Sequence, residues 1–203
     1  MLGGGLQGCC IALELARRGA TVDLFDRNAQ LLSRTAVANE GKIHLGYMYA
    51  GDPSLLTARM MMRGALVFAP FFARHLDMPI DDIARSEPAV YLVHRDSQRP
   101  VQQVADYLSQ VHAVVCEAAD GLNGAYFGTE FKTGLRRWTD DERQTEFGPA
   151  VLAAFDTPEI AVEPVELARR LRERIAAHPY IRPHLMHTVV SVEDDAGRFL
   201  GVS

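Results

Sequence analysis

The chain has 203 residues, of which 48% are hydrophobic and 23% are charged, and its formal net charge is −5. This composition predicts one sizeable globular domain, or one domain and part of a second, with no general electrostatic attraction to nucleic acid or anionic membranes. No apolar run approaches the ~20 residues of a membrane-spanning helix, and no signal peptide is visible. The three cysteines form no Cys-x-x-Cys pair, which favours reduced thiols in a cytoplasmic protein.

The first 26 residues contain a glycine pattern that ends on an acid. Gly3, Gly5 and Gly8 match the spacing G-x-G-x-x-G, and Asp26 follows Gly3 by 23 positions. A helix-like run and then a short apolar run lie between them. Together these features are typical of a dinucleotide-binding βαβ unit, whereas the glycines alone would also suit a turn before an ordinary helix.

Each residue type in this pattern has a physical reason. Gly3 lets the chain turn sharply, Gly5 lets backbone approach a pyrophosphate, and Gly8 lets the helix pack close to the sheet. The N–H groups at the start of the helix favour a diphosphate. The Asp26 carboxylate can accept hydrogen bonds from a ribose 2′-OH and would repel a 2′-phosphate. The pattern therefore predicts FAD or NAD rather than NADP.

The start of the chain departs from this pattern. Only Met1 and Leu2 precede Gly3, whereas the glycine turn should follow a buried strand of ~5–6 residues. We therefore expect the chain to be a fragment that lacks most of its first strand.

The remaining pattern predicts alternating helices and strands, with loops between them. Helices are expected over residues 9–18, 55–76, 101–119 and 165–177, and strands over 21–25, 89–94, 150–155, 181–185, 188–192 and 199–202. We expect a turn into a short helix over 27–32, a kink or a break at Pro70, a turn over 95–100, a loop-rich stretch over 121–148 and a hairpin turn over 194–197. The acidic pairs Asp81-Asp82, Asp140-Asp141 and Asp194-Asp195 are interpreted as solvated turns.

The segment 33–49 is a long loop rich in small residues, with Gly41 and Gly46 as expected points of close backbone approach. His44 is the titratable side chain in it that could accept a substrate proton, or it could fix the loop by hydrogen bonds. Lys42 could place positive charge near a flavin or face the surface. Tyr47 and Tyr49 could line a substrate cavity or pack the following helix.

Three stretches resemble FAD-dependent oxidoreductases of the D-amino-acid oxidase superfamily. They are GGGLQGCCIALELARRGATVDLFDR, NEGKIHLGYMYAGDPSLLTARMMMRGA, and EPVELARRLRERI with HTVVSVEDDAGRFLGV. The second stretch is most similar to L-2-hydroxyglutarate oxidase/dehydrogenase-like proteins, although Glu40, Lys42 and Asp52 differ from the residues usual there. The resemblance implies a flavoprotein, of which this chain is the N-terminal part.

The resemblance implies an α/β fold: a partial doubly wound, Rossmann-like FAD-binding domain with an inserted α+β substrate or cap segment. Residues 1–76 would form the first part of the FAD-binding domain, 77–155 the inserted segment, and 156–203 the return to the FAD-binding domain.

The resemblance also implies which residues bind FAD. The pyrophosphate would lie against Gly3, Gly5, Leu6, Gln7 and Gly8, and the adenosine ribose against Asp26 with Arg27 beside it. Arg34 and Thr35 would reach the pyrophosphate, Asn39, Glu40, Gly41, Lys42 and Ile43 would pass the isoalloxazine, and the backbone of Val189 would meet the adenine.

Two other groups of side chains are weaker candidates. His184 and His187 are three apart in a strand-like stretch, so we expect them on opposite faces, and no metal site is predicted. Arg136-Arg137 with Trp138 could bind a substrate carboxylate.

The sequence therefore predicts FAD-dependent oxidation of a CH–OH or CH–NH bond in a small carboxylate substrate, with His44 as the candidate base. The fragment alone is expected to be inactive. An NAD-dependent dehydrogenase and a non-catalytic nucleotide-binding fragment are the alternatives. The only expected partner is the small-molecule substrate.

Overall fold

The computed structural model describes residues 1–76, 82–122, 125–129, 131, 134–196 and 198–202. It forms two compact units. The terminal unit comprises Met1–Glu40 and Glu163–Ser203, and the central unit comprises Gly41–Val162. These limits differ from the expected domain limits at 76/77 and 155/156, because a strand at Lys42–Ile43 pairs with a strand at Ile160–Ala161. The roles expected for the three segments remain predictions.

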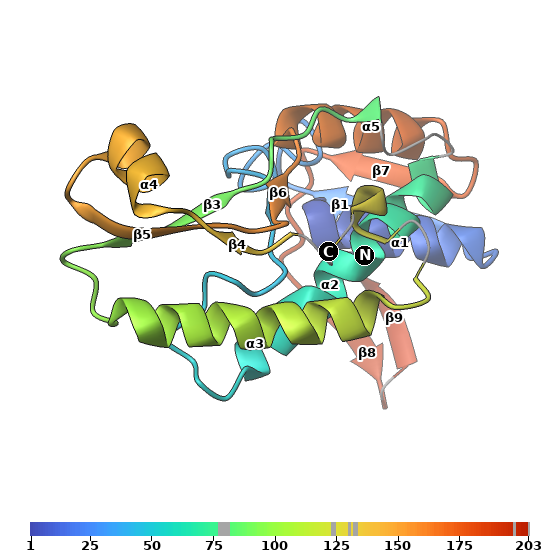
Figure 1. Ribbon diagram of the computed structural model, residues 1–203. Coiled ribbons are helices and arrows are strands. Elements are labelled where there is room, and N and C mark those ends of the chain that lie inside the picture. The colour runs from blue at the N-terminus through green and yellow to red at the C-terminus, as the bar shows by residue number, and fades with distance from the viewer. Residues whose placement is uncertain (77–81, 123–124, 130, 132–133, 197, 203) are drawn as a thin grey trace. The chain divides into compact units, whose positions relative to one another are not determined.

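The terminal unit is built around parallel strands. Strand β1 (Val22–Asp26) pairs in parallel with β7 (Ile181–Leu185), and Leu2 bridges Phe25 in parallel on β1. Helix α1 (Leu6–Arg17) connects Leu2 to β1, and α5 (Pro164–Ala176) leads into β7 (Figure 1). This order is the βαβ arrangement that the glycine pattern predicts, so the predicted α/β class is confirmed.

Local sequence explains the helices of this unit. In α1 the residues Cys9, Ala12, Leu13 and Ala16 are buried, at the spacing of one helical face. Gly19 has φ +89° and ends the helix, because glycine adopts this left-handed conformation without strain. α5 begins with Pro164 after Glu163, whose side chain accepts from Val165 N. α1 and α5 pack against each other and against β7.

The end of the terminal unit differs from the prediction. The strand expected over 188–192 is wrong: residues 188–191 form no strand, and β8 (Val192–Asp195) starts at their end. β8 pairs in antiparallel fashion with β9 (Arg198–Val202), which confirms the return strand. The short helix expected over 27–32 is also wrong, because the segment forms turns.

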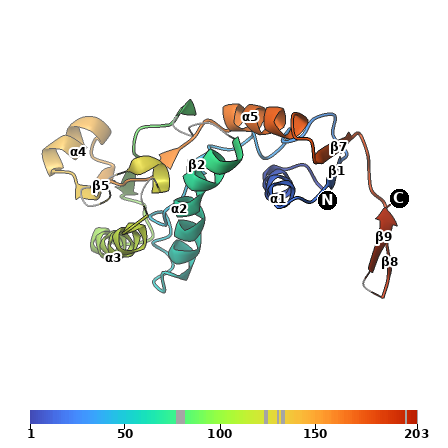
Figure 2. The same cartoon turned by 90° about the vertical axis from the view of Figure 1, so that its right-hand side faces the viewer.

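The central unit combines small antiparallel sheets with two long helices. The sheet order is β3 (Val90–His94), β5 (Val151–Asp156), β4 (Arg136–Arg137), and a second sheet pairs β2 (Lys42–Ile43) with β6 (Ile160–Ala161). Helix α2 (Leu56–Leu76) packs against α3 (Val101–Ala119) (Figure 2) and against the short turn at Ala125–Gly128, in which Tyr126 and Phe127 have positive φ. α2 continues through Pro70, so the expected break into two helices does not occur.

Helix α4 (Asp140–Phe147) occupies part of the stretch predicted as loop. Thr139 accepts from Glu142 N, and the Glu142 carboxylate accepts from Thr139 N, which is a capping box. The acids interpreted as a solvated turn are therefore the first turn of this helix, where negative charge stabilises the helix dipole. Asp82 lies in a short helical turn, Asp194 and Asp195 are strand residues, and Asp81 lies outside the described residues.

No helix in the described part of the chain is both long enough and apolar enough to cross a membrane.

Candidate functional site

The glycine turn of the terminal unit is shaped by close backbone contacts. Gly3 has φ +92°, and its N–H donates to Phe25 O at 2.9 Å. A Cβ added to Gly8 would lie 2.0 Å from Gly3 O, so only glycine lets α1 start this close to the turn. A Cβ added to Gly5 would meet nothing within 4 Å. The space beside Gly5 is therefore open on the side where a ligand could approach.

The start of α1 offers hydrogen-bond donors to that open space. Gly5 is the N-cap residue and supplies no side chain to cap the helix. Leu6 and Gln7 follow in the first turn, and both are exposed. The first N–H groups of a helix have no partner inside it and lie at its positive end. The helix start can therefore bind an anionic group such as a diphosphate.

Asp26 ends β1 with its carboxylate held in place. Gly4 N–H donates to Oδ2 at 2.6 Å, and both the backbone N–H and the side-chain amide of Asn28 donate to Oδ1 at 2.7 Å. Burial opposes ionisation, but the hydrogen bonds from Asn28 and Gly4 together hold the pKa of Asp26 below its usual value. Asp26 is therefore negatively charged at neutral pH.

The Asp26 carboxylate retains capacity for a ligand. An ionised carboxylate has about four lone-pair sites, and the three hydrogen bonds from Gly4 and Asn28 leave one of them on Oδ2. A ribose hydroxyl is a suitable donor for this site, whereas a 2′-phosphate would be repelled.

A cavity of about 400 Å³ lies beside this carboxylate, a volume within the range of small-molecule sites. Several of the residues expected to bind the nucleotide line it together: Gly3, Asp26, Arg27, Arg34 and Val189. Residues that the sequence did not indicate complete the lining: Leu2, Phe25, Asn28, His187 and Thr188.

The other residues expected on the pyrophosphate and flavin side do not line this cavity. Thr35, Asn39 and Glu40 are exposed, and the Asn39 side chain donates to Thr35 O at 2.7 Å. Arg34 Nε donates to Asn28 Oδ1 at 3.0 Å, so Arg34 is held near the cavity by the same Asn28 that holds Asp26.

Gly4 and Asn28 hold the Asp26 carboxylate, and the sequence interpretation missed both. A Cβ added to Gly4 would lie 2.2 Å from Leu31 Cδ2 and 3.1 Å from Asp26 Oδ2, so Gly4 lets the turn approach the acid. Its position between Gly3 and Gly5 concealed it, because the G-x-G spacing treats it as a variable position. The signal that could have found Asn28 is its place two residues after Asp26, where asparagine commonly forms local turns.

The two histidines expected on opposite faces lie together. The rings of His184 and Phe25 stack with centroids 4.5 Å apart, and the His184 and His187 centroids are 5.9 Å apart. The prediction was wrong because β7 ends at Leu185 and Met186 has φ +60°, so the alternation of a strand stops before His187.

The segment expected to pass the isoalloxazine enters the central unit at Gly41. Gly41 has φ +65°, and its O accepts from Val162 N at 3.0 Å. Lys42 is exposed and Ile43 is buried, as expected for successive residues of the short strand β2. Gly46 has φ +115°, and a Cβ there would lie 2.7 Å from Ala58 Cβ on α2. The predicted close approach at Gly46 is therefore confirmed.

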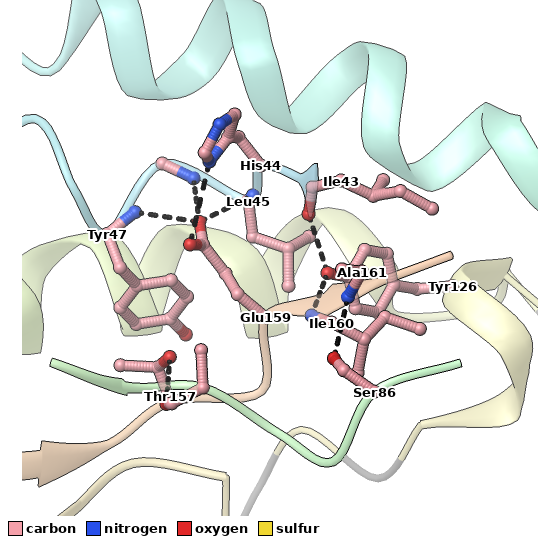
Figure 3. Close-up of polar contacts among 12 residues, drawn as sticks. Ile43, His44, Leu45, Tyr47, Ser86, Tyr126, Thr157, Glu159, Ile160 and Ala161 are labelled. Atoms are coloured by element: carbon pink, nitrogen blue, oxygen red, sulfur yellow. Dashed lines mark hydrogen bonds and ion pairs between the residues drawn. The ribbon is translucent and has the colours of Figure 1, made fainter. Parts of the chain in front are cut away.

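A buried carboxylate fixes the loop that follows (Figure 3). Glu159 is 3% exposed, and its Oε1 accepts from the N–H groups of Leu45, Gly46 and Tyr47 at 2.8, 2.9 and 3.2 Å. These three contacts stabilise a turn whose N–H groups would otherwise be buried without partners. No local pattern indicates Glu159, which lies in the short stretch between β5 and β6.

Buried tyrosines reinforce the same loop. Tyr126 Oη donates to Ile43 O at 2.6 Å and accepts from Ile160 N at 2.9 Å, so it links β2 to β6. Tyr107 Oη donates to Gly46 O at 2.8 Å. Tyr47 is fully buried and its Oη contacts His112 Nδ1 of α3 at 2.7 Å. Tyr47 therefore packs the loop against α3.

His44 lies beside Glu159. Its Nδ1 is 3.7 Å from Glu159 Oε2, its ring meets the edge of Tyr49 with centroids 5.9 Å apart, and one fifth of its side chain is exposed. Nδ1 is buried and has no hydrogen-bond partner among the described residues. The hydrogen bonds that fix this loop thus come from Glu159 and the tyrosines, and none is seen from the buried His44 nitrogen.

The arginine-tryptophan stretch is already paired within the central unit. Arg136 donates to Asp156 at 2.7 Å and to Glu142 at 3.0 Å, and Trp138 Nε1 donates to Asp156 Oδ1 at 2.6 Å. Two carboxylates therefore neutralise Arg136. Within the described ranges, no group of three His, Cys, Asp or Glu side chains could hold a metal ion, and Cys9, Cys10 and Cys116 form no disulfide.

Solved structures share this fold. Glycine oxidase from Geobacillus kaustophilus matches with a TM-score of 0.65 at 18% identity over 96% of this chain and 48% of that chain. Iminodiacetate oxidase from Chelativorans sp. BNC1 matches with a TM-score of 0.66 at 20% identity over 98% and 48%. L-alpha-glycerophosphate oxidase from Mycoplasma pneumoniae, with FAD bound, matches with a TM-score of 0.61 at 18% identity over 96% and 46%.

This chain therefore spans about half the length of these enzymes, and at these identities the likeness is one of fold. No curated protein sequence matches it. The model of the family "FAD dependent oxidoreductase" matches residues 2–203, which is nearly the whole chain. Because this match covers far more than half of the chain, the chain belongs to the FAD-dependent oxidoreductase family.

Proposed function

We propose that the protein is an FAD-dependent oxidoreductase that oxidises a CH–OH or CH–NH bond of a small carboxylate substrate. The observation that carries this proposal is the 400 Å³ cavity beside Asp26, in a chain that belongs to an FAD-dependent family. The charged carboxylate, its spare lone pair and the open space beside Gly5 all fit an adenine dinucleotide without a 2′-phosphate.

Each part of FAD has proposed protein partners. The open helix start beyond Gly3 and Gly5 would hold the pyrophosphate, with Leu6, Gln7 and Gly8 in its first turn. Asp26 would bind the ribose, with Arg27 beside it. Arg34 and Thr35 would reach the pyrophosphate side, the backbone of Val189 would meet the adenine, and the segment from Asn39 to Ile43 would pass the isoalloxazine.

The chemistry requires the protein to handle one proton. When bound, FAD would supply a two-electron acceptor for the hydride of the substrate carbon. The proton of the substrate hydroxyl or amino group must go to a base, and the product is a carbonyl compound or an imine. His44 is the proposed base, because an imidazole suits proton transfer near neutral pH and its side chain is partly exposed beside a carboxylate.

The substrate class follows from two kinds of similarity. The stretch NEGKIHLGYMYAGDPSLLTA resembles L-2-hydroxyglutarate oxidase/dehydrogenase-like proteins, which favours a 2-hydroxy acid. Glycine oxidase and iminodiacetate oxidase, which share the fold, are named for amino acid-type substrates. Both classes place a CH–OH or CH–NH bond next to a carboxylate.

The experiment is anaerobic reduction of the protein, expressed from its complete reading frame and reconstituted with FAD, by a panel of 2-hydroxy acids and amino acids. Loss of the oxidised flavin absorbance with one class supports the proposal and identifies that class. The matched control is a 2-hydroxy acid whose hydroxyl-bearing carbon carries no hydrogen, which must leave the absorbance unchanged.

The other outcomes contradict the proposal. FAD binding without reduction by any compound of the panel would indicate a non-catalytic nucleotide-binding role. A protein that binds no flavin but binds NAD would indicate an NAD-dependent dehydrogenase.

A further inference from the structure

We propose that Glu159 is a positioning residue that holds His44 as the tautomer with hydrogen on Nδ1, so that Nε2 keeps its lone pair for the substrate proton. The role of that lone pair as a proton acceptor rests on the proposed function. The tautomer itself is a property of the central unit and can be tested without cofactor or substrate.

The two oxygens of Glu159 have different surroundings. Oε1 accepts three backbone N–H groups, from Leu45, Gly46 and Tyr47. Hydrogen bonds from several N–H groups to one carboxylate are charge-assisted and favour negative charge at that site. Oε2 accepts none of these three bonds and lies 3.7 Å from His44 Nδ1 (Figure 3). A buried carboxylate needs compensation, and at Oε2 the imidazole is positioned to supply it.

The ring of His44 can satisfy this carboxylate in only one neutral form. A neutral imidazole carries hydrogen on one nitrogen and a lone pair on the other. With hydrogen on Nδ1 the ring presents a donor to Oε2, whereas a lone pair there would face negative charge in a buried place. The distance of 3.7 Å between Nδ1 and Oε2 is longer than a hydrogen bond. The preference for hydrogen on Nδ1 therefore arises from the electrostatic attraction between the N–H group and the carboxylate.

The surroundings of His44 do not offer a competing charge in the described contacts. The other ring close to it is that of Tyr49. Burial, and next the neighbouring Glu159, raise the pKa of Tyr49, so its phenol is neutral near pH 7. Glu159 is therefore the charged group that orients the imidazole.

The consequence for the proposed reaction concerns Nε2. With Nδ1 protonated, Nε2 can accept the proton of a substrate hydroxyl or amino group as that bond breaks. The ring becomes an imidazolium, and the nearby Glu159 carboxylate offsets its charge. The proton later leaves Nε2 for water, which restores the starting tautomer.

Glu159→Gln separates this role from the fixing of the loop. The amide oxygen of glutamine can accept the same three N–H groups, so it takes the place of Oε1. The amide NH₂ then occupies the place of Oε2 and presents a donor to His44 Nδ1. The variant should therefore keep the loop while reversing the tautomer, which moves the hydrogen to Nε2.

The test is NMR of the protein labelled with ¹⁵N-histidine, at a pH where the imidazoles are neutral. Long-range proton–nitrogen correlations distinguish a nitrogen that carries hydrogen from one that carries a lone pair, and the signals lost in His44→Gln assign the ring. We expect hydrogen on Nδ1 in the wild type and on Nε2 in Glu159→Gln. Glu163→Gln, at an exposed carboxylate, should leave His44 unchanged.

Two results would overturn the inference. One is a wild-type His44 with hydrogen on Nε2 or with an even mixture of tautomers. The other is a folded Glu159→Gln protein with the wild-type tautomer. If Glu159→Gln does not fold, the wild-type spectrum decides alone. Because no FAD or substrate is present, failure here is distinct from a failure of the flavin reduction experiment.

Discussion

The terminal unit and the central unit shape their two candidate segments by different means. In the terminal unit, glycines let two backbone segments pack closely, as at Gly8 and Gly3. The Asp26 carboxylate accepts hydrogen bonds from Gly4 of the glycine turn and from Asn28, two residues further along the chain. In the central unit, the loop from Ile43 to Tyr47 is held by buried side chains from distant parts of the chain, above all Glu159.

The two segments should therefore tolerate different substitutions. The glycine turn depends on the absence of side chains, so it is sensitive to added atoms. The loop depends on polar atoms that satisfy buried N–H groups, so it is sensitive to removed atoms.

Removal of the Glu159 carboxylate should have the largest effect on stability. Glu159→Ala leaves the N–H groups of Leu45, Gly46 and Tyr47 buried without their acceptor, which should lower the free energy of unfolding by roughly 3–5 kcal/mol. Urea unfolding followed by circular dichroism measures this loss.

The matched control is Glu163→Ala. Glu163 is exposed and accepts from one backbone N–H, that of Val165, so its removal should cost about 1 kcal/mol. Equal losses for the two variants would show that the buried carboxylate does not hold the loop.

Added methyl groups should distinguish the two glycines of the turn. Gly8→Ala places a Cβ 2.0 Å from Gly3 O and should destabilise the protein by roughly 1–3 kcal/mol. Gly5→Ala meets no atom within 4 Å and should change stability by less than about 0.5 kcal/mol. Its methyl group would nevertheless stand where the pyrophosphate approaches, so FAD binding should weaken.

Unfolding in urea and titration with FAD measure the two effects separately. The distinction between the two glycines would be contradicted if Gly5→Ala destabilised the protein as much as Gly8→Ala does, or if Gly5→Ala bound FAD as tightly as the wild type.

The hydrogen bonds to Asp26 should appear in the pH dependence of stability. The folded-state pKa of Asp26 is lowered, so its carboxylate stabilises the folded protein above the unfolded-state pKa of about 3.9. That contribution disappears as the pH falls through the folded-state pKa. At this partly exposed position we expect about 1 kcal/mol or less, because solvent screens the interaction.

Urea unfolding between about pH 5 and the acid limit of the folded state tests this effect. The wild type should lose more stability than Asp26→Asn over this range. Parallel pH profiles for the two proteins would mean that Asp26 gains nothing from Gly4 and Asn28.

Much of the fold could be predicted because its signals are local. α1, β1, α3, α5 and β7 lie within a few residues of their expected limits, since Gly19, Pro100 and Pro164 mark helix ends and apolar periodicity marks the buried faces. α4 was missed because it buries no residue and so has no apolar periodicity, although Thr139 and Glu142 have the capping-box spacing.

The candidate site was predictable to a different extent in each unit. Gly3, Gly8 and Asp26 form a compact motif whose geometry follows from the sequence. Glu159 could not be recognised, because its partners lie 112 to 114 residues away and only folding brings them together. The sequence thus indicated His44 but not the carboxylate beside it.

The central claim, that the terminal unit binds the adenosine end of FAD through Asp26, is tested most directly by fluorescence titration of FAD into the wild type, Asp26→Ala and Asp23→Ala. Asp23 is the matched control because it lies on the same strand, contacts His184 and does not line the 400 Å³ cavity. We predict that Asp26→Ala weakens binding roughly tenfold or more, the effect of losing a hydrogen bond to a charged group, while Asp23→Ala stays within about twofold. Wild-type affinity in Asp26→Ala, or equal weakening in both variants, would contradict the claim.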